Sequence, residues 1–172
     1  SFVDFSLSLE ELRKNLNSKW RNQLKKSESY NIKIKIGNES KSFEWLLSNY
    51  RELMKKNKFQ GPSPKLYQYI FDNFKSNLLL FQAFKDNTPI AGQMFFLHGN
   101  TSTYLVGYNS NSGRENYAHN FLIWNAISYL KKSNYKFLDL GGIDNLNTPG
   151  IAKFKNGVNG ENFGLIGDWI SI

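Results

Sequence analysis

The hydrophobic pattern changes its period in the middle of the chain, and this change constrains the fold more than any other feature. Residues 78–86, 88–98 and 101–109 are strand-like, and turn sequences of the Asp-Asn and Gly-Asn type separate them. Strands joined by such short turns pair antiparallel, so this stretch predicts a three-stranded meander. Gly92 and Gly107 interrupt two of these strands, which predicts a bulge or a close approach by another backbone or a ligand.

A crossover connection follows the meander. Residues 114–133 predict a long helix that is apolar on almost every side between Phe121 and Leu130, so we expect it to lie buried against a sheet. Residues 137–140 then predict a short strand. A strand, a helix and a second strand in this order predict a parallel pair. The expected architecture is therefore α/β (α+β), with a mixed sheet and helices on both of its faces.

The flanking segments supply the helices that cover this sheet. Residues 1–30 predict one helix that begins at a capping box formed by Ser8 and Glu11. The other expected elements are a strand at 31–37, helices that begin at Ser42, Ser63 and Thr148, and a last strand at 163–170. Neither a repeat nor a linker interrupts this order, so we expect a single domain over residues 1–172.

The composition excludes several classes of protein. The chain has no cysteine and only two histidines, His98 and His119, which excludes disulfides and a thiol nucleophile and leads us to expect no metal. No apolar run approaches the length of a membrane span, so we expect no transmembrane segment. The formal net charge of +8 favours phosphate-bearing partners such as RNA, nucleotides or an anionic membrane surface. Because the chain starts with Ser1 rather than Met, we expect it to be a piece of a longer protein.

The start of the crossover helix is the first candidate ligand site, because ligands tend to bind where the strands of such sheets diverge. The side chains expected to line it come from the preceding strand and the first helical turns: Tyr104, Tyr108, Arg114, Asn116, His119 and Asn120. Amides at the helix start and the Arg114 guanidinium could together hold an anion. The alternative is a plain polar loop at the end of the sheet. For His119 the alternatives are a catalytic base and a structural hydrogen-bonding group.

Two charged residues outside that loop, Asp139 and Lys155, can each be interpreted in two ways. Asp139 is a lone carboxylate in an apolar strand, so it either ties down the turn at Gly141-Gly142 or orients a substrate amine. Lys155 stands near the end of the short helix that begins at Thr148. Its ammonium could stabilise an oxyanion while an acyl carbonyl is attacked, or it could simply face the solvent.

A basic strip runs along the predicted N-terminal helix. Arg13, Arg21 and Lys25 lie at helical spacing beside the apolar stripe of that helix. The strip is either a solvated helix face or a surface that contacts the phosphate groups of RNA or another ligand.

Several strings of residues, taken in order, resemble the FemAB branch of the GNAT acyltransferases, which includes the peptidoglycan-bridge aminoacyltransferases. These strings are residues 3–27, Tyr104–Gly107, the long helix with Trp124, Leu138-Asp139-Leu140-Gly141-Gly142-Ile143, and Phe154-Lys155 followed by a turn that contains glycine. Each string alone is short, whereas their order and spacing together carry the resemblance over nearly the whole chain.

The resemblance implies an enzyme that transfers an aminoacyl or acyl group to an amine of a cell-wall or cell-surface precursor. In bridge-forming members the donor is an aminoacyl-tRNA and the acceptor is the peptide stem of a cell-wall precursor. By position, Phe154 and Lys155 match the pair that sets a lysine near the reacting carbonyl. Bridge-forming members contain two such modules, so the resemblance also implies that this chain is the second half of a longer protein. We expect that protein to work in the cytoplasm, with the inner face of the membrane as a further option.

One departure from the wider GNAT fold concerns the cofactor. Acetyl-CoA users carry a Gln/Arg-x-x-Gly-x-Gly/Ala loop before the long helix, whereas residues 108–114 of this chain contain a single glycine, Gly113. We therefore expect no cofactor. Two alternatives stay open, namely an N-acetyltransferase that uses acetyl-CoA or another acyl-CoA on an amino sugar, and a non-catalytic basic module that binds RNA or the precursor.

Overall fold

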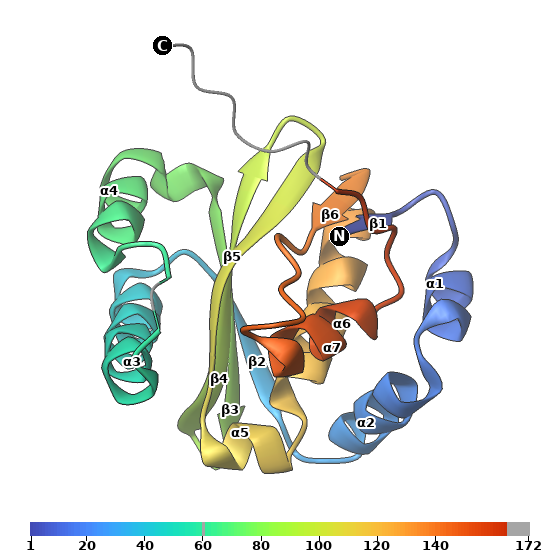
Figure 1. Cartoon of the computed structure of the whole chain (residues 1–172), viewed down its shortest axis with the longest axis horizontal. Helices are drawn as coiled ribbons and strands as arrows, with labels where there is room; N and C mark the ends of the chain where they lie inside the picture. The colour runs from blue at the N-terminus through green and yellow to red at the C-terminus, as the bar shows by residue number, and fades with distance from the viewer. Residues whose placement is uncertain (60, 165–172) are drawn as a thin grey trace.

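A computed structural model describes residues 1–59 and 61–164, and it contains a six-stranded mixed sheet with helices on both faces (Figure 1). The strands are β1 (Phe2–Asp4), β2 (Lys33–Gly37), β3 (Leu78–Lys85), β4 (Thr88–His98), β5 (Thr101–Asn109) and β6 (Phe137–Asp139). The helices are α1 (Leu9–Asn15), α2 (Ser18–Glu28), α3 (Ser40–Asn57), α4 (Pro64–Phe74), the 3-10 turn η1 (Lys75–Asn77), α5 (Asn111–Glu115), α6 (Ala118–Lys132) and α7 (Pro149–Asn156). The predicted fold class is confirmed.

The sheet has the strand order β1-β6-β5-β4-β3-β2. The predicted meander is confirmed, since β3, β4 and β5 pair antiparallel in sequence order. Asp86 and Asn87 both have positive φ in the first turn, the backbone conformation that a two-residue hairpin turn needs. The predicted crossover is also confirmed, because β5 and β6 are parallel.

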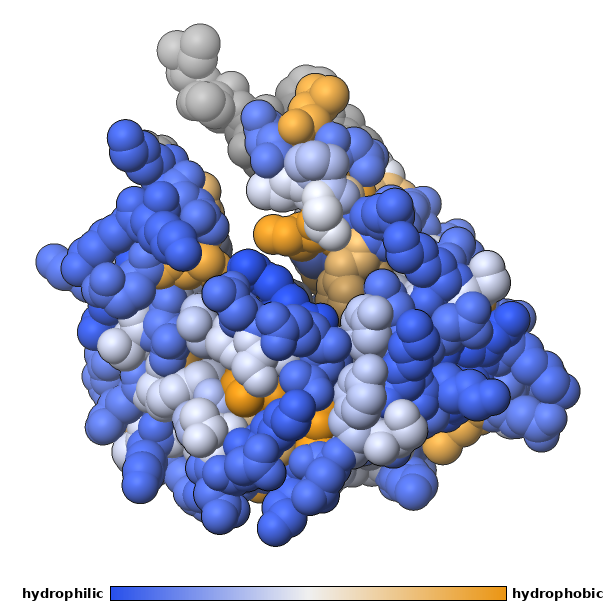
Figure 2. All heavy atoms as spheres, turned by 90° about the horizontal axis from the view of Figure 1, so that it is seen from below, coloured by the Kyte–Doolittle hydropathy of each residue, from blue (hydrophilic) through white to orange (hydrophobic). Residues whose placement is uncertain are grey.

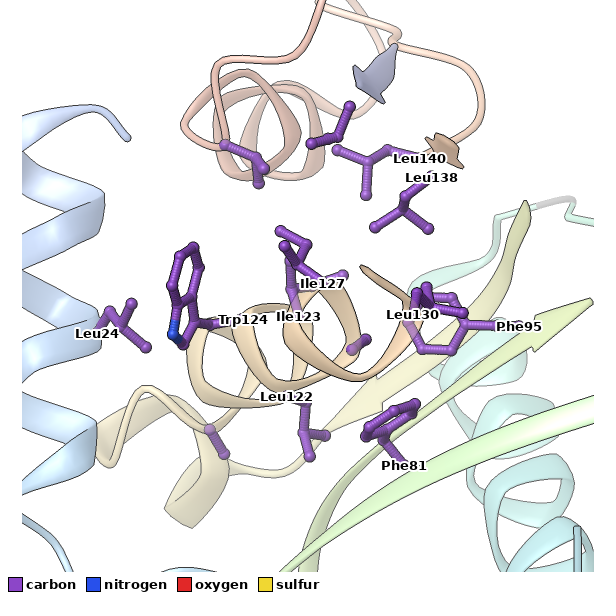
Figure 3. Packing of buried hydrophobic residues seen from close by; sticks show 14 of the residues in the cluster. Leu24, Phe81, Phe95, Leu122, Ile123, Trp124, Ile127, Leu130, Leu138 and Leu140 are labelled. Carbon is purple, nitrogen blue, oxygen red and sulfur yellow. The ribbon is translucent and has the colours of Figure 1, made fainter. Parts of the chain in front are cut away.

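Two apolar clusters hold the three layers together, one on each face of the sheet. On one face α3 and α4 pack through side chains that include Phe43 and Phe71, whose rings stack 4.0 Å apart. On the other face α6 is the central element, and Leu122, Ile123 and Leu130 are fully buried. Figure 3 shows α6 surrounded by Leu24 of α2, by Phe81 and Phe95 of the sheet, and by Leu138 and Leu140. The apolar character of α6 on almost every side follows from this burial.

The N-terminal region differs from the single helix predicted over 1–30. It contains strand β1 and two helices, and the break between the helices falls at Leu16 and Asn17. Asn17 has extended backbone angles and its side chain accepts a hydrogen bond from the amide of Lys19, so it begins α2 as an N-cap. The capping box of Ser8 and Glu11 is confirmed at the start of α1.

The long helix predicted over 114–133 is wrong in one respect, since it is two helices, α5 and α6. Tyr117 lies between them with φ +51°, a left-handed conformation that an α-helix cannot continue through. The helix predicted to begin at Ser42 instead begins at Ser40, and Ser42 is buried inside α3. The start at Ser63 is confirmed, because its side chain accepts a hydrogen bond from the amide of Lys65.

The last predicted strand, over 163–170, lies largely outside the described residues. Phe163 and Gly164, its first two residues, are not in a strand. Slightly earlier, Glu161 forms a single antiparallel bridge with Phe2 at the edge of the sheet. A strand over the rest of that range stays a prediction.

Strands β5 and β6 pair only at one end and then separate. Thr101–Thr103 pair with Phe137–Asp139, and from Tyr104 onward β5 has no partner on this side among residues 1–59 and 61–164. The ladder with β4 slips by one residue at the same place, where Phe95 pairs with Tyr104 but Met94 pairs with Val106, so Leu105 is the extra residue of a β-bulge. Figure 2 shows the face seen from below hollowed between the side that carries α3 and α4 and the side that carries α7.

Candidate active site

Lys155 lies at the point where β5 and β6 separate. Its side chain comes from the last turn of α7, and its Nζ donates a hydrogen bond of 2.8 Å to the carbonyl oxygen of Gly142. The same Nζ lies 5.8 Å from the centre of the Tyr104 ring, which fits a cation–π contact. Burial lowers the pKa of the Lys155 ammonium, and the negative charge of Asp139 acts in the opposite direction. The lysine is therefore half-buried, and its ammonium points toward Tyr104 and Gly142 where β5 and β6 separate.

Asp139 holds the turn that carries the partner of Lys155. Its Oδ1 accepts a hydrogen bond of 2.7 Å from the amide of Gly141, so the structural role predicted for this carboxylate is present. Gly141 has φ +74°, a conformation that residues with a side chain rarely adopt. The next residue, Gly142, offers its carbonyl to Lys155. A role of Asp139 in orienting a substrate amine stays a prediction.

Tyr104 forms the other wall of this site. Its ring packs edge-on against Phe95 at 5.6 Å, and a Cβ placed on Gly107 would overlap its hydroxyl oxygen. Gly107 thus lets the tyrosine lie flat along its own strand, so the close neighbour of this glycine is a side chain of the same strand and not the other backbone or ligand that the sequence predicts. Burial raises the pKa of the Tyr104 hydroxyl, so this group stays protonated at neutral pH and can donate a hydrogen bond.

Tyr108 does not join Tyr104, although residues four apart in a regular strand share a face. Its ring packs edge-on against Trp45 of α3 at 5.6 Å, on the other face of the sheet. The bulge at Leu105 shifts the alternation by one residue and so sends the two tyrosines to opposite faces. The expectation that both rings line one side of the site is therefore wrong.

Phe154 and His119 pack together beside the site. The Phe154 ring lies 5.8 Å from the His119 ring and 6.0 Å from that of Trp20, between α6 and α2. His119 Nε2 lies 2.9 Å from the carbonyl oxygen of Tyr108, and because a carbonyl only accepts, this nitrogen carries the proton. Burial lowers the pKa of His119 to about 4, so the ring is neutral at pH 7. These contacts match the structural alternative, and a direct role of either ring toward substrate stays a prediction.

Two of the remaining residues expected at the crossover loop, Asn116 and Asn120, make side-chain hydrogen bonds within the protein. Asn116 accepts a hydrogen bond of 2.9 Å from Lys85 of β3, which ties the end of α5 to the sheet, and it donates one to the carbonyl of Ser112 within α5. Asn120 is buried and donates to Gln23 of α2 at 3.4 Å. Arg114 is exposed on α5, at the lower end of the sheet in Figure 1. The hydrogen bonds of Asn116 and Asn120 join them to Lys85, Ser112 and Gln23, and not to Lys155 or Tyr104.

The basic strip lies on α1 and α2. Arg13 makes a two-pronged contact with Glu28, with one nitrogen–oxygen distance of 2.7 Å, and also lies 5.5 Å from the Trp124 ring. Arg21 donates to the carbonyl of Lys14 at 2.7 Å, whereas Lys25 is exposed. Two of the three cations are therefore partnered inside the protein, and contact of any of them with phosphate stays a prediction.

The Gly142 carbonyl and two clefts beside α7 could not be found from the sequence. A cleft of about 390 Å³ is lined by Asp139, Gly141 and Gly142 together with Asn145 and Asn156. A larger one of about 530 Å³ lies between α2 and α7 and shares Asn145 and Asn156 with the first. Both clefts depend on how α7 packs, and no local pattern encodes that packing.

No helix between residues 1 and 164 is both long and apolar enough to cross a membrane. Within the same part of the chain, His, Asp and Glu side chains nowhere gather in a group of three that could hold a metal ion.

A six-stranded mixed sheet whose strands β5 and β6 separate, with helices on both faces, gives this chain the fold of the GNAT acyltransferases. The crystal structure of FemX superposes with a TM-score of 0.79 and 12% identity, over 91% of this chain and 57% of FemX. A model of the FemAB family matches residues 79–171, which is more than half of the chain. The chain belongs to the FemAB family.

Other solved structures share the fold at similarly low identity. L-PGS from Bacillus licheniformis has a TM-score of 0.62 and 11% identity, over 94% of this chain and 56% of that one. An aminoglycoside acetyltransferase from an uncultured soil metagenomic sample, in complex with sisomicin, has a TM-score of 0.56 and 12% identity, over 82% and 96% of the two chains. No curated protein has a significantly similar sequence. The chain spans little more than half the length of FemX and of L-PGS.

Proposed function

We propose that this chain is an acyl-transfer module in which Lys155 stabilises the oxyanion formed when an amine attacks an acyl carbonyl. The observation that carries the proposal is the position of the Lys155 ammonium. It lies 2.8 Å from the Gly142 carbonyl and beside the Tyr104 ring, where β5 and β6 separate. An ammonium has three N–H donors, so a carbonyl partner occupies one and leaves two for a substrate.

The reaction needs hydrogen-bond donors that stabilise the negative charge on the oxygen atom of the acyl carbonyl. The lone pair of the acceptor amine forms a bond to the acyl carbon, and the carbonyl electrons move to oxygen, where Lys155 and the Tyr104 hydroxyl donate hydrogen bonds. When the carbonyl forms again, the bond from the acyl carbon to the leaving oxygen breaks. The amine loses a proton and the leaving oxygen gains one, so the substrates themselves balance the proton transfer.

Membership of the FemAB family supports an aminoacyl-tRNA as the donor and the peptide stem of a cell-wall precursor as the acceptor. Both molecules bear phosphate groups, which suits a chain with a net charge of +8. Since the chain spans 57% of FemX, we also propose that a second module completes the acceptor site. Aminoacyl-tRNA is a cytoplasmic molecule, and the cytoplasm is where we place the reaction.

Single-turnover transfer from aminoacyl-tRNA to a cell-wall stem peptide tests this proposal in the full chain. Lys155→Met keeps the length of the side chain and removes its charge, so we expect the rate to fall about 100-fold or more, as for other lost oxyanion donors. Lys132→Met, on an exposed lysine at the end of α6, is the matched control. An unchanged rate in Lys155→Met would remove the lysine from the mechanism.

The geometry near α5 argues against acyl-CoA as the donor. The amide of Gly113 already donates to Ser110 Oγ at 3.0 Å, and the space beside its Cα is filled by Asn109 and the Ile90 carbonyl. This amide therefore cannot also bind a pyrophosphate. Calorimetric titration with acetyl-CoA tests this point, and micromolar binding would favour an N-acetyltransferase that acts on an amino sugar.

The non-catalytic alternative is a module that binds RNA or the precursor. It predicts binding of aminoacyl-tRNA without transfer to any amine, whereas our proposal predicts a labelled product from the same mixture. A time course followed by mass spectrometry distinguishes the two.

A further inference from the structure

The smaller cleft beside α7 adjoins the ammonium of Lys155. It encloses about 390 Å³. Gly142, whose carbonyl accepts the hydrogen bond of Lys155, lines this cleft together with Gly141 and Asp139. An acyl group whose carbonyl oxygen lies at Lys155 can therefore extend into the cleft.

The charge of this cleft is opposite to that of the whole molecule. Among the described residues that line it, Asp139 is the only one with a charged side chain, although the chain as a whole carries +8. The side chain of Asp139 is half-buried and its Oδ1 accepts the amide of Gly141, whereas Oδ2 accepts no hydrogen bond from the part of the chain that the structure describes. The amino group of Ser1 donates to the carbonyl of Gly141 at 3.2 Å and forms no ion pair with this carboxylate. The cleft thus offers a carboxylate oxygen to a cationic group.

An aminoacyl group carries such a cation on the carbon atom next to its carbonyl. If Lys155 holds the carbonyl oxygen, the α-ammonium comes close to the lysine ammonium, and two like charges repel each other. A carboxylate near both of them offsets this repulsion. Asp139 is near enough to Lys155 for its negative charge to raise the pKa of that lysine. The position of Asp139 therefore suits a donor that brings a second ammonium to the site.

The walls of the cleft suit the rest of an aminoacyl group. Ile143 and Phe163 offer apolar surface, whereas Asn145 and Asn156 offer side-chain amides. Gly142 leaves its part of the wall without a side chain, since a Cβ at this position would meet nothing within 4 Å. The space beside Gly142 is thus open to a substrate.

We propose that this cleft receives the aminoacyl group of the donor, with the α-ammonium paired to Asp139 Oδ2, and that it thereby selects aminoacyl over plain acyl donors. Asp139 binds and orients the donor in this arrangement and takes no part in making or breaking bonds. The inference rests on the proposed acyl transfer at Lys155 and adds to it the chemical class of the acyl group.

Single-turnover transfer by the full chain from alanyl-tRNA and from lactyl-tRNA to a cell-wall stem peptide tests the proposal. Lactyl-tRNA has a hydroxyl group where alanyl-tRNA has its α-ammonium. We expect Asp139→Asn to lower the ratio of the alanyl rate to the lactyl rate about ten-fold or more, because only the alanyl donor loses a charge-assisted contact. The ratio cancels any effect of the variant on Lys155, which acts on both donors alike. Asp72→Asn, on the exposed face of α4, should leave the ratio unchanged.

The possible failures are distinguishable. If the parent chain transfers neither acyl group, the proposed function fails and this inference fails with it. If the parent transfers both and Asp139→Asn keeps the same ratio, the aminoacyl cleft is wrong while the role of Lys155 stands.

A second pair of variants tests the space itself. Gly142→Val places a side chain in the cleft and should slow transfer from alanyl-tRNA about ten-fold or more by excluding the aminoacyl group. Gly150→Val, at a glycine of α7 that also has open space but does not line this cleft, is the matched control. Equal rates in these two variants would overturn the placement of the aminoacyl group.

Discussion

The Nζ of Lys155 lies 2.8 Å from the carbonyl oxygen of Gly142, and Asp139 fixes that carbonyl through the amide of Gly141. Helix α7 and the turn after β6 therefore hold the Lys155 ammonium between them. The carboxylate acts on this ammonium in two ways, since it orients the turn and also raises the pKa that burial lowers. The predictions below begin with this arrangement.

The pH dependence of acyl transfer should report the ammonium of Lys155. Only the protonated form stabilises an oxyanion, so the rate should fall as the pH rises through a pKa that lies below the ordinary lysine value. Asp139→Asn keeps the acceptor for Gly141 but removes the charge that raises this pKa, and the alkaline limb should move to lower pH. Asp72→Asn, on the exposed face of α4, is the control in the pH–rate profile. An alkaline limb that stays in place would contradict the pairing.

Gly107 should be essential for the position of Tyr104. Alanine at this position would place a methyl group where the Tyr104 hydroxyl lies, so the ring must move or the strand must bend. We expect Gly107→Ala to lower the free energy of unfolding by about 1–3 kcal/mol in urea titrations, as overpacking usually does. Gly37→Ala, in β2, meets nothing within 4 Å and should change stability far less. Equal effects of the two would show that the contact is unimportant.

Leu122 should be one of the most sensitive core positions. It is fully buried at the centre of α6, so Leu122→Ala should cost about 2–5 kcal/mol of stability through the lost contacts and the cavity that remains. Leu146 has the same side chain but is 90% exposed, and Leu146→Ala should stay within about 0.5 kcal/mol of the parent. Denaturant midpoints of both variants measure the contrast, and a small effect at Leu122 would argue against the central place of α6.

Acid should destabilise the fold through His119. Burial lowers the pKa of this ring to about 4 in the native state, whereas an unfolded chain protonates histidine near its ordinary pKa of about 6.5. The unfolded state therefore binds more protons between these values, and stability should fall as the pH drops through this window. The full loss is at most about 3–4 kcal/mol, because each pKa unit corresponds to about 1.4 kcal/mol.

Chemical denaturation at several pH values between 4 and 7 measures this effect. His119→Gln should flatten the pH dependence of the free energy of unfolding in that window. His98→Gln, at the exposed last position of β4, should leave the slope as it is. If the slope persists in His119→Gln, another group is responsible for the acid sensitivity.

Local signals predicted most of the elements because their causes lie within a few residues. The alternation over β3, β4 and β5, the turn residues Asp86 and Asn87, and the caps at Ser8 and Ser63 each act on their immediate neighbours. Strand β1 was missed because three residues are too few to show an alternation, and it forms only by pairing with β6. The break at Tyr117 was missed because a left-handed tyrosine has no composition signal.

The residues of the candidate site could also be predicted only in part from the sequence. Lys155, Tyr104 and Asp139 could be proposed from their residue types and their order, but the sequence alone also grouped Tyr108 with them. One extra residue in β5 decided that question, because a bulge reverses which face every later side chain of the strand occupies.

By itself, then, the sequence determined the order of helices and strands, the apolar faces that must be buried, and the charge that the molecule presents. The tertiary structure alone decided that the Gly142 carbonyl meets Lys155, that Tyr104 and Tyr108 lie on opposite faces, and that α2 and α7 enclose a cleft. The reason is physical: periodicity and capping depend on neighbours along the chain, whereas these contacts join segments far apart in sequence that only the packing of the sheet brings together.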